Sequence, residues 1–289
     1  MNFSEYTLIS FGDSFTFGQD LVPQYSIDHK DVRPAQKQWK EDCNKKSYTQ
    51  VIADSMGFKD SLNFGVLAGS NERSMTLLES FLRTNPDKKV FVLFNFTSAS
   101  RFMNIFKVDG KKEYDIVDLL PNAEAREWLI EGRYTSIDAK SIIKHYTYWR
   151  NSVQDVYSHI KDRRNLYYLL SSHNTPHVTF DVVNNTDYLM LRDNPLEYIL
   201  NTNEDLIVKE MDYLTSYYNE ILTASPLLCH MGIDDLDGHR NFVAYLNNRA
   251  KFEHGDPDFY QVIDNGHWNS KGHTEVARLI EKFLNERYK

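Results

Sequence analysis

The stretch "LISFGDSFTFGQD", residues 8–20, joins an apolar run to two glycines, an acid and a serine. The apolar residues from 6 to 11 predict a short strand buried in the protein core. Gly12 allows a tight exit from this strand, and Gly18 lets the backbone approach its surroundings closely a second time. Ser14 therefore follows the carboxyl end of a predicted strand, the edge at which open parallel sheets bind their ligands. A serine that only caps a helix would give the same pattern.

Predicted strands and helices alternate along the rest of the chain. Further strands are predicted at 61–66, 88–96, 165–172 and 177–183, and one more just before the last helix. Helices are predicted at 47–58, from residue 70 onward, at 141–161 and at 205–222, and a last helix closes the sequence. This alternation predicts an α/β fold with parallel βαβ units and helices on both faces of the sheet. No repeat or flexible linker divides the sequence, so we expect one domain over 1–289 with insertions near 19–46, 100–164 and 223–258.

The composition is that of a folded globular protein, with 289 residues, 41% hydrophobic and 13% aromatic. A formal net charge of −8 and the lack of a basic stripe argue against nucleic acid as the partner. The first residues show no signal-peptide pattern, and no apolar run is long enough to span a bilayer. We therefore expect no membrane association, a cytoplasmic location, and reduced thiols at Cys43 and Cys229.

A second group of polar residues lies near the other end of the chain, in "DNGHWNSKGH". Asp264 and His267 are three residues apart in a predicted loop, where a carboxylate could reach an imidazole. Such a contact fixes the histidine tautomer and leaves the other ring nitrogen to accept a proton from a serine. Turn and cap chemistry before a helix would also account for an Asp and a His at this spacing.

Taken together, "FGDSFTFG" and "DNGHWNSKGH" resemble the first and last sequence blocks of the SGNH hydrolases, also called the GDSL esterase/lipase family. The segment "SYTQVIADSMGFKDSLNFGVLAGSNERS" is similar to the second block of that family. The resemblance covers residues 1–96 and 259–289. It implies a flavodoxin-like three-layer sandwich around a mostly parallel, five-stranded sheet.

The same resemblance implies roles for individual residues. Ser14 would be the nucleophile, and its own N–H would be one donor of the oxyanion hole. The N–H of Gly69 would be the second donor. His267 would be the general base, with Asp264 as its orienting partner.

The third block departs from the family pattern. The family ends its middle strand with Gly–x–Asn–Asp, whose Asn completes the oxyanion hole, whereas this strand ends "LFNFTSASR". Thr97 stands where the Asn belongs and Asn95 lies two residues earlier, so both face the same side of a strand. Either is a candidate donor, and both could simply cap the strand end. Asp13, Asn71 and Arg101 are expected to contact the substrate. The Thr-x-x-x-Arg ending is similar to that of phage-encoded members of the family. If this protein were phage-encoded, we would expect it to be a component of the virion.

These residues favour a serine esterase that forms an acyl-enzyme on Ser14. Insertions rich in Tyr, Trp, Asn and Asp suit a carbohydrate, so we expect O-acetyl or other short acyl esters on glycans as substrates. Alternatives are a non-catalytic carbohydrate-binding or structural protein on the same scaffold, a lipase or thioesterase, and an acyltransferase. No metal-ligand spacing or nucleotide-binding loop is present, so neither a metal nor an organic cofactor is expected.

Overall fold

A parallel four-stranded sheet forms the centre of the protein. The structure is a computed structural model that describes residues 1–22, 32–67, 69–98, 101–107, 114–119, 152–183, 229–239, 241–262 and 266–288. The strands are β1 (Thr7–Phe11), β2 (Asp60–Asn63), β3 (Val90–Phe96) and β6 (His177–Asp181), in the order β2-β1-β3-β6. Every residue of β1, β3 and β6 is buried, which explains why β3 is almost continuously apolar in sequence.

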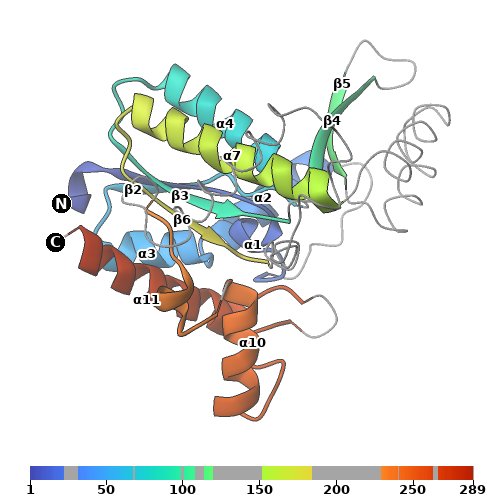
Figure 1. Cartoon of the computed structure of the whole chain (residues 1–289), viewed down its shortest axis with the longest axis vertical. Helices are drawn as coiled ribbons and strands as arrows, with labels where there is room; N and C mark the ends of the chain where they lie inside the picture. Colours follow the sequence, from blue (N-terminus) through green and yellow to red (C-terminus); the bar gives the residue numbers. More distant parts are fainter. Residues whose placement is uncertain are drawn as a thin grey trace, which may run out of the picture.

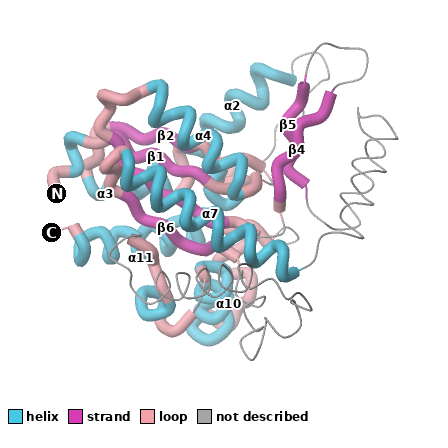
Figure 2. The backbone as a smooth tube through the Cα atoms, turned by 45° about the horizontal axis from the view of Figure 1, so that its top comes forward, coloured by secondary structure: helices cyan, strands magenta, loops and turns pink. Residues whose placement is uncertain are grey.

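Helices cover both faces of the sheet, which gives the three layers that the sequence predicts (Figures 1 and 2). Alternate residues of β1 point to opposite faces: Leu8 packs toward α3 (Tyr48–Met56) and α11 (Ser270–Arg287). Ile9 packs toward α4 (Asn71–Thr84) and α7 (Ser152–Ser172). Two apolar cores on either side of one sheet follow from this period of two.

The structure corrects two predictions about strands. The described sheet has four strands, not five, although His230 continues it through a single parallel bridge to Thr179 at the β6 edge. Residues 165–172 are the second half of α7 and not a strand. Before the last helix, the described residues form a single bridge, between Gln261 and Trp268. The helix predicted at 205–222 and the first part of the one predicted at 141–161 lie outside the described residues.

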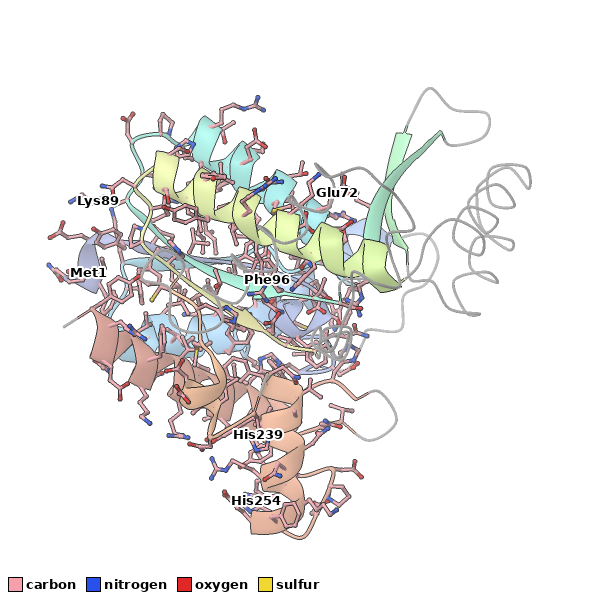
Figure 3. The ribbon with its side chains drawn as sticks, in the orientation of Figure 1. Met1, Glu72, Lys89, Phe96, His239 and His254 are labelled. Atoms are coloured by element: carbon pink, nitrogen blue, oxygen red, sulfur yellow. The ribbon has the colours of Figure 1, made fainter. Side chains whose placement is uncertain are left out.

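The regions that we expected as insertions contribute further elements to the described structure. Residues 19–46 include α2 (Val32–Asn44), and 100–164 include an antiparallel hairpin of β4 (Phe102–Lys107) and β5 (Tyr114–Leu119). The backbone N–H of Met103 in β4 donates to Glu72 at the start of α4, which Figure 3 labels beside the hairpin. Residues 223–258 include α10 (Phe242–Glu253) and the 3-10 turn η3 (Ile233–Leu236); a first 3-10 turn, η1 (Phe3–Glu5), precedes β1.

The first and last described residues lie side by side (Figure 1). The amino group of Met1 donates to the carbonyl of Tyr288 at 2.7 Å, and α11 packs along α3. Among the described helices, none has the length and apolar character needed to cross a membrane.

Candidate active site

Ser14 begins a single helical turn directly after β1. This turn, α1 (Ser14–Phe17), is capped at its start by Asp13, whose side chain accepts from the N–H of Phe15 at 3.1 Å. Gly18 closes the turn in a left-handed conformation with φ 80°. Gly12 has no room for a side chain, because a Cβ there would lie 2.3 Å from Thr16 Oγ1. The glycines identified in the sequence thus shape the turn that carries Ser14.

The buried carboxylate of Asp13 holds this turn against the end of β3. Its Oδ1 accepts from Asn95 at 3.2 Å, and its Oδ2 accepts from the hydroxyl of Thr97 at 2.6 Å and from Arg101 at 2.9 Å. Asn95 donates in addition to Thr16 at 2.9 Å. A buried carboxylate is stable only with such donors, so these contacts fix the position of α1 relative to the sheet.

His267 is positioned by the loop that precedes α11. Its carbonyl accepts from the N–H of Val262 at 2.8 Å, which closes the loop at its base. Asn269 caps α11 and donates at 3.0 Å to the carbonyls of Phe259 and Gln261, so one side chain joins the helix to the loop. The adjacent Trp268 is fully buried and packs against Phe15 with ring centroids 4.7 Å apart. The histidine therefore stands on a rigid support next to α1.

The structure brings Ser14 and His267 together although 253 positions separate them in the sequence. Ser14 Oγ lies 3.0 Å from Nε2 of His267, and Nδ1 of the same ring lies 2.9 Å from Oδ2 of Asp20. Asp264, the expected partner of His267, lies outside the described residues. A carboxylate accepts hydrogen bonds and cannot donate them, so the contact to Asp20 places the proton of the neutral ring on Nδ1. Nε2 is then free to accept from the Ser14 hydroxyl.

Asp20, the carboxylate that contacts His267 in the structure, is not among the site residues expected from the sequence. It ends the quoted stretch, six residues after Ser14 and two after Gly18. The signal was present as a carboxylate just beyond a left-handed glycine. Nothing in the hydrophobic pattern shows, however, that the chain curls back at this point toward a histidine from the other end of the sequence.

The expected oxyanion donors lie near Ser14 but are bonded within the protein. The N–H of Gly69 donates to the carbonyl of Val66 at 2.9 Å. The Thr97 hydroxyl and the Asn95 amide donate to Asp13, as described above. The N–H of Ser14 belongs to the first turn of α1, where helical N–H groups have no acceptor in their own helix.

Asn71 and Arg101, expected to contact substrate, join the same network. Arg101 Nη1 donates to Asp13, and its side chain is only 14% exposed. Asn71 accepts from the N–H of Thr97 at 2.9 Å and lies 3.4 Å from Nδ1 of His159 on α7. Asp13, Thr97, Asn71 and His159 thus form a continuous polar path from the serine turn into the interior.

That path leads to a buried arginine cluster, made of His159, Arg163, Asp181 and His230. Arg163 donates to both oxygens of Asp181, at 2.5 and 2.6 Å, and to His159 Nε2 at 3.0 Å. Its guanidinium carbon lies 4.1 Å from the ring centre of Phe96, the residue that Figure 3 labels at the end of β3. The charge is buried, but the carboxylate, the imidazole and the aromatic face all stabilise it.

Burial keeps several histidines neutral around the site. Loss of water lowers the pKa of His159 and of His230 well below the usual range, and the Arg163 charge lowers both further. Burial also lowers the pKa of His273 to about 3, with a smaller effect from His267. His273 is accordingly a neutral acceptor, bonded to the N–H of Tyr48 at 3.1 Å.

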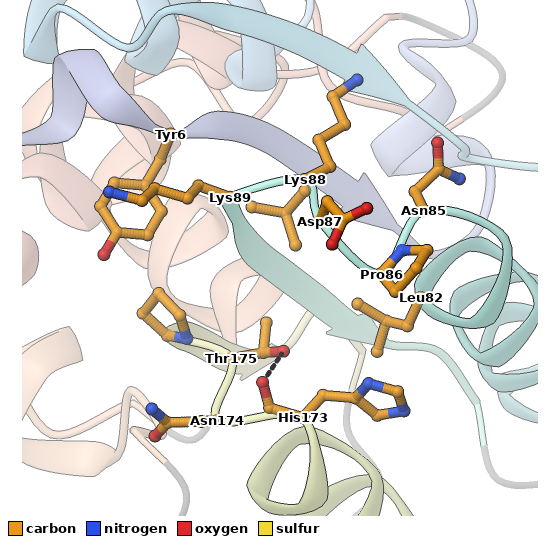
Figure 4. Close-up of a pocket in the computed structure, with 12 residues that line it drawn as sticks. Tyr6, Leu82, Asn85, Pro86, Asp87, Lys88, Lys89, His173, Asn174 and Thr175 are labelled. Carbon is orange, nitrogen blue, oxygen red and sulfur yellow. Dashed lines mark hydrogen bonds between the residues drawn. The ribbon is translucent and has the colours of Figure 1, made fainter.

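A cavity of about 210 Å³ lies at the opposite, amino edge of the sheet (Figure 4). It is bordered by Tyr6, Lys89 and Thr175, which lie at or just before the first residues of their strands. Ligands of parallel sheets bind at the carboxyl edge, so this cavity is not part of the Ser14 site. Within the described ranges, no three His, Cys, Asp or Glu side chains are arranged to hold a metal ion.

No family model matches the sequence, and no curated protein matches it either. Solved structures do match over nearly the whole chain. A member of the lipolytic protein G-D-S-L family from Veillonella parvula is 14% identical, with 97% of each chain covered and a TM-score of 0.42. The lipase/acylhydrolase from Enterococcus faecalis is 11% identical, with 98% of this chain and 96% of that chain covered and a TM-score of 0.39. A carbohydrate esterase with divergent catalytic and non-catalytic binding functions is 9% identical, with 97% of this chain and 68% of that chain covered and a TM-score of 0.40. The course of the backbone is thus similar to that of these lipolytic and esterase proteins.

Proposed function

We propose that this protein is a serine esterase of the SGNH type, with Ser14 as nucleophile and His267 as general base. The observation that carries the proposal is the 3.0 Å contact between Ser14 Oγ and His267 Nε2, with Nδ1 held by a carboxylate. A serine hydroxyl is a weak nucleophile by itself, and this arrangement is the one that activates it.

In the first step, Ser14 Oγ forms a bond to the carbonyl carbon of the ester while its proton passes to His267 Nε2. The tetrahedral intermediate then breaks the bond to the alcohol oxygen, which takes that proton from the imidazolium and leaves as a neutral alcohol. Water attacks the acyl-enzyme in the second step and gives a proton to Nε2. The serine ester bond then breaks, His267 returns the proton to Ser14 Oγ, and a carboxylic acid is released.

The negative charge of the intermediate needs donors close to Ser14. The N–H groups of Ser14 and Gly69 are the candidates, and one such donor contributes about 3 kcal/mol to the transition state. The Gly69 N–H bonds to Val66 in the structure, so it would have to turn toward the substrate or share its proton.

For the substrate, we propose short acyl esters, chiefly O-acetyl groups on carbohydrate. Residues 100–164 contain five Tyr and two Trp, side chains that stack on sugars, and residues 223–258 contain Asn and Asp, side chains that bond sugar hydroxyls. A lipase or thioesterase, or an acyltransferase that passes the acyl group to a sugar hydroxyl, would use the same pair of residues.

One observation favours a second candidate, a non-catalytic carbohydrate-binding protein on this scaffold. The side chains at the end of β3 bond to Asp13, and the Gly69 N–H bonds to Val66, so both are engaged inside the protein. The alignment of Ser14 with His267 weighs against this candidate, because a binding module has no need of an activated serine.

Hydrolysis of p-nitrophenyl acetate by the unchanged protein, Ser14→Ala and His267→Ala tests the proposal. Ser4→Ala is the matched control, since Ser4 is an exposed serine in η1. We expect loss of turnover in the two site variants only, with folding verified by circular dichroism, and labelling of Ser14 by a fluorophosphonate. A rate that falls as the pH is lowered, because protonation removes the base, would support a histidine base. Equal rates in all four proteins would favour the binding protein.

Acetylated xylan and esters of longer acyl chains then separate the substrate classes. Release of acetate from the glycan supports the carbohydrate proposal. Cleavage of long-chain lipid esters without activity on acetylated sugars would contradict it.

A further inference from the structure

We infer that Asp20 is the carboxylate that orients His267, an inference that rests on the proposed function of the Ser14 site. Asp20 does not touch the reacting atoms and acts through the histidine, so it is a positioning residue. In the resemblance described above, this role falls to Asp264.

The first argument is the contact itself. Asp20 Oδ2 lies 2.9 Å from Nδ1 of His267, while Nε2 of the same ring lies 3.0 Å from Ser14 Oγ. The neutral ring carries a single N–H, so the nitrogen that faces the carboxylate must be the donor. Because that one proton already has Asp20 as its acceptor, a second carboxylate could only share or replace this bond.

The second argument is the way in which the backbone places Asp20. The N–H groups of Gly18 and Gln19 both donate to the carbonyl of Ser14, at 3.1 Å each, so the chain wraps tightly around the end of α1. Leu21 is buried beyond Asp20, and the Trp39 ring of α2 donates to the carbonyl of Val22 at 3.1 Å. The segment that carries Asp20 is thus held on both sides.

Asp20 itself has φ 69°, in the left-handed region. Asp and Asn tolerate this region better than other residues with a side chain, yet it is still less favourable than the right-handed region. Strain of this kind persists where the surrounding structure enforces it, and it is concentrated at functional sites. Here it turns the carboxylate back toward His267.

The third argument concerns solvent. The side chains of Asp20 and His267 are 22% and 18% exposed, so each is largely shielded from water. A shielded carboxylate stabilises the imidazolium that forms during acylation more strongly than an exposed one does. Ser14 and its orienting acid would then both come from one stretch of seven residues, 14–20.

Two substitutions remove the carboxylate without disturbing the backbone. Asp20→Asn keeps the shape of the side chain, and Asp20→Gly suits the positive φ. Asp264→Asn is the competing variant, and Asp54→Asn removes a charge from an exposed position on α3 as a control.

In p-nitrophenyl acetate hydrolysis, we expect kcat to fall between about 10²- and 10⁴-fold in both Asp20 variants, by analogy with other Ser–His–Asp sites. KM should change less than about threefold, because uniform substrate binding is not affected. The acid limb of the kcat/KM profile should move to lower pH in Asp20→Asn, since the imidazolium has lost its carboxylate. Added formate should restore part of the activity of Asp20→Gly and leave Asp54→Asn unchanged. A purely structural role would produce neither the shifted limb nor the rescue.

A larger loss of kcat in Asp264→Asn than in Asp20→Asn would overturn the inference, as would a kcat within threefold of the unchanged protein in Asp20→Asn. Proton NMR gives an answer that does not depend on activity. The downfield Nδ1–H signal, assigned by its loss in His267→Gln, should persist in Asp264→Asn and vanish in Asp20→Asn; the reverse result would assign the contact to Asp264. If neither the unchanged protein nor any variant hydrolyses esters, the proposed function fails. The Nδ1–H signal of His267 still tests its contact with Asp20 in that case.

Discussion

Two sets of carboxylate and imidazole groups lie near the same end of the sheet, and they differ in their access to water. In the site formed by Ser14, His267 and Asp20, called the serine site below, Asp20 and His267 keep 22% and 18% of their side-chain surface exposed. In the buried arginine cluster, neither Arg163 nor Asp181 exceeds 3%. Similar chemical groups are thus partly exposed in one place and almost fully buried in the other.

The two regions also differ in how fully their hydrogen bonds are satisfied. Arg163 bonds both oxygens of Asp181, and its guanidinium nitrogens also contact two histidines, His159 and His230. In the serine site, Ser14 and His267 share one bond whose proton can move. Burial with complete pairing indicates stability, whereas partial exposure with a movable proton indicates chemistry.

The largest expected effect on stability is at Asp181. Asp181→Asn leaves the buried charge of Arg163 without its carboxylate, and breaking a buried ion pair from one side costs about 3–5 kcal/mol. Urea unfolding followed by circular dichroism measures this loss. Asp20→Asn should cost less than about 1 kcal/mol in the same assay, since its partner is partly exposed.

The double variant Arg163→Met with Asp181→Leu is the control for this prediction. Replacing both partners by apolar residues removes the unpaired charge, so most of the lost stability should return. If Asp181→Asn alone lowered the free energy of unfolding by less than about 1 kcal/mol, the two regions would not differ in their contribution to stability.

The next prediction concerns how the free energy of unfolding depends on pH. The folded protein keeps His159, His230 and His273 neutral, while the unfolded chain protonates them below about pH 6.5. The unfolded state then binds more protons, so the free energy of unfolding falls as the pH is lowered. The fall should begin near pH 6.5 and, for His273, continue to about pH 3.

Urea unfolding at pH 7.5, 6.5 and 5.5 measures this dependence. Each of these histidines should remove about 1 kcal/mol between pH 6.5 and 5.5. His273→Gln should make the slope shallower by one such contribution, because glutamine does not titrate. Stability that is constant from pH 6.5 to 5.5 would show that these histidines are not held neutral.

The last prediction is a smaller loss of stability, at Thr97 on the polar path between the two regions. Thr97→Val removes the donor at 2.6 Å from Asp13 but leaves Asn95 and Arg101 in place, so we expect a loss of about 1–2 kcal/mol. Thr84→Val is the matched control, since the exposed Thr84 hydroxyl donates to carbonyls of its own helix and accepts only from the adjacent Asn85 among the described residues. Equal unfolding free energies for the two variants would mean that Thr97 adds nothing to the anchoring of Asp13.

The sequence predicts most of the sheet because β1 and β3 are buried on both faces and are mostly apolar, with Ser10 and Asn95 as interior exceptions. It fails at 165–172 for a physical reason. The buried face of α7 includes His159 and Arg163 as well as Leu166 and Leu170, so polar residues interrupt the helical period. The apolar run that follows then resembles a short buried strand.

The candidate site shows a similar division. The glycines around Ser14 and the position of His267 before a helix are local signals, and the structure brings these two residues together. The carboxylate of Asp20 follows Gly18 in the sequence, but its contact with His267 depends on a left-handed turn and on a distant loop. Contacts of this kind are a property of the folded chain and not of any short segment.

The separation of 253 positions between Ser14 and His267 has a consequence for the order of events during synthesis. A ribosome releases Ser14 and Asp20 early, while most of the chain is still missing. The histidine arrives only with the segment that leads into α11. Until then Ser14 has no imidazole beside it, so under the proposed function a growing or truncated chain would not hydrolyse esters, and ester hydrolysis would report on the completion of the fold.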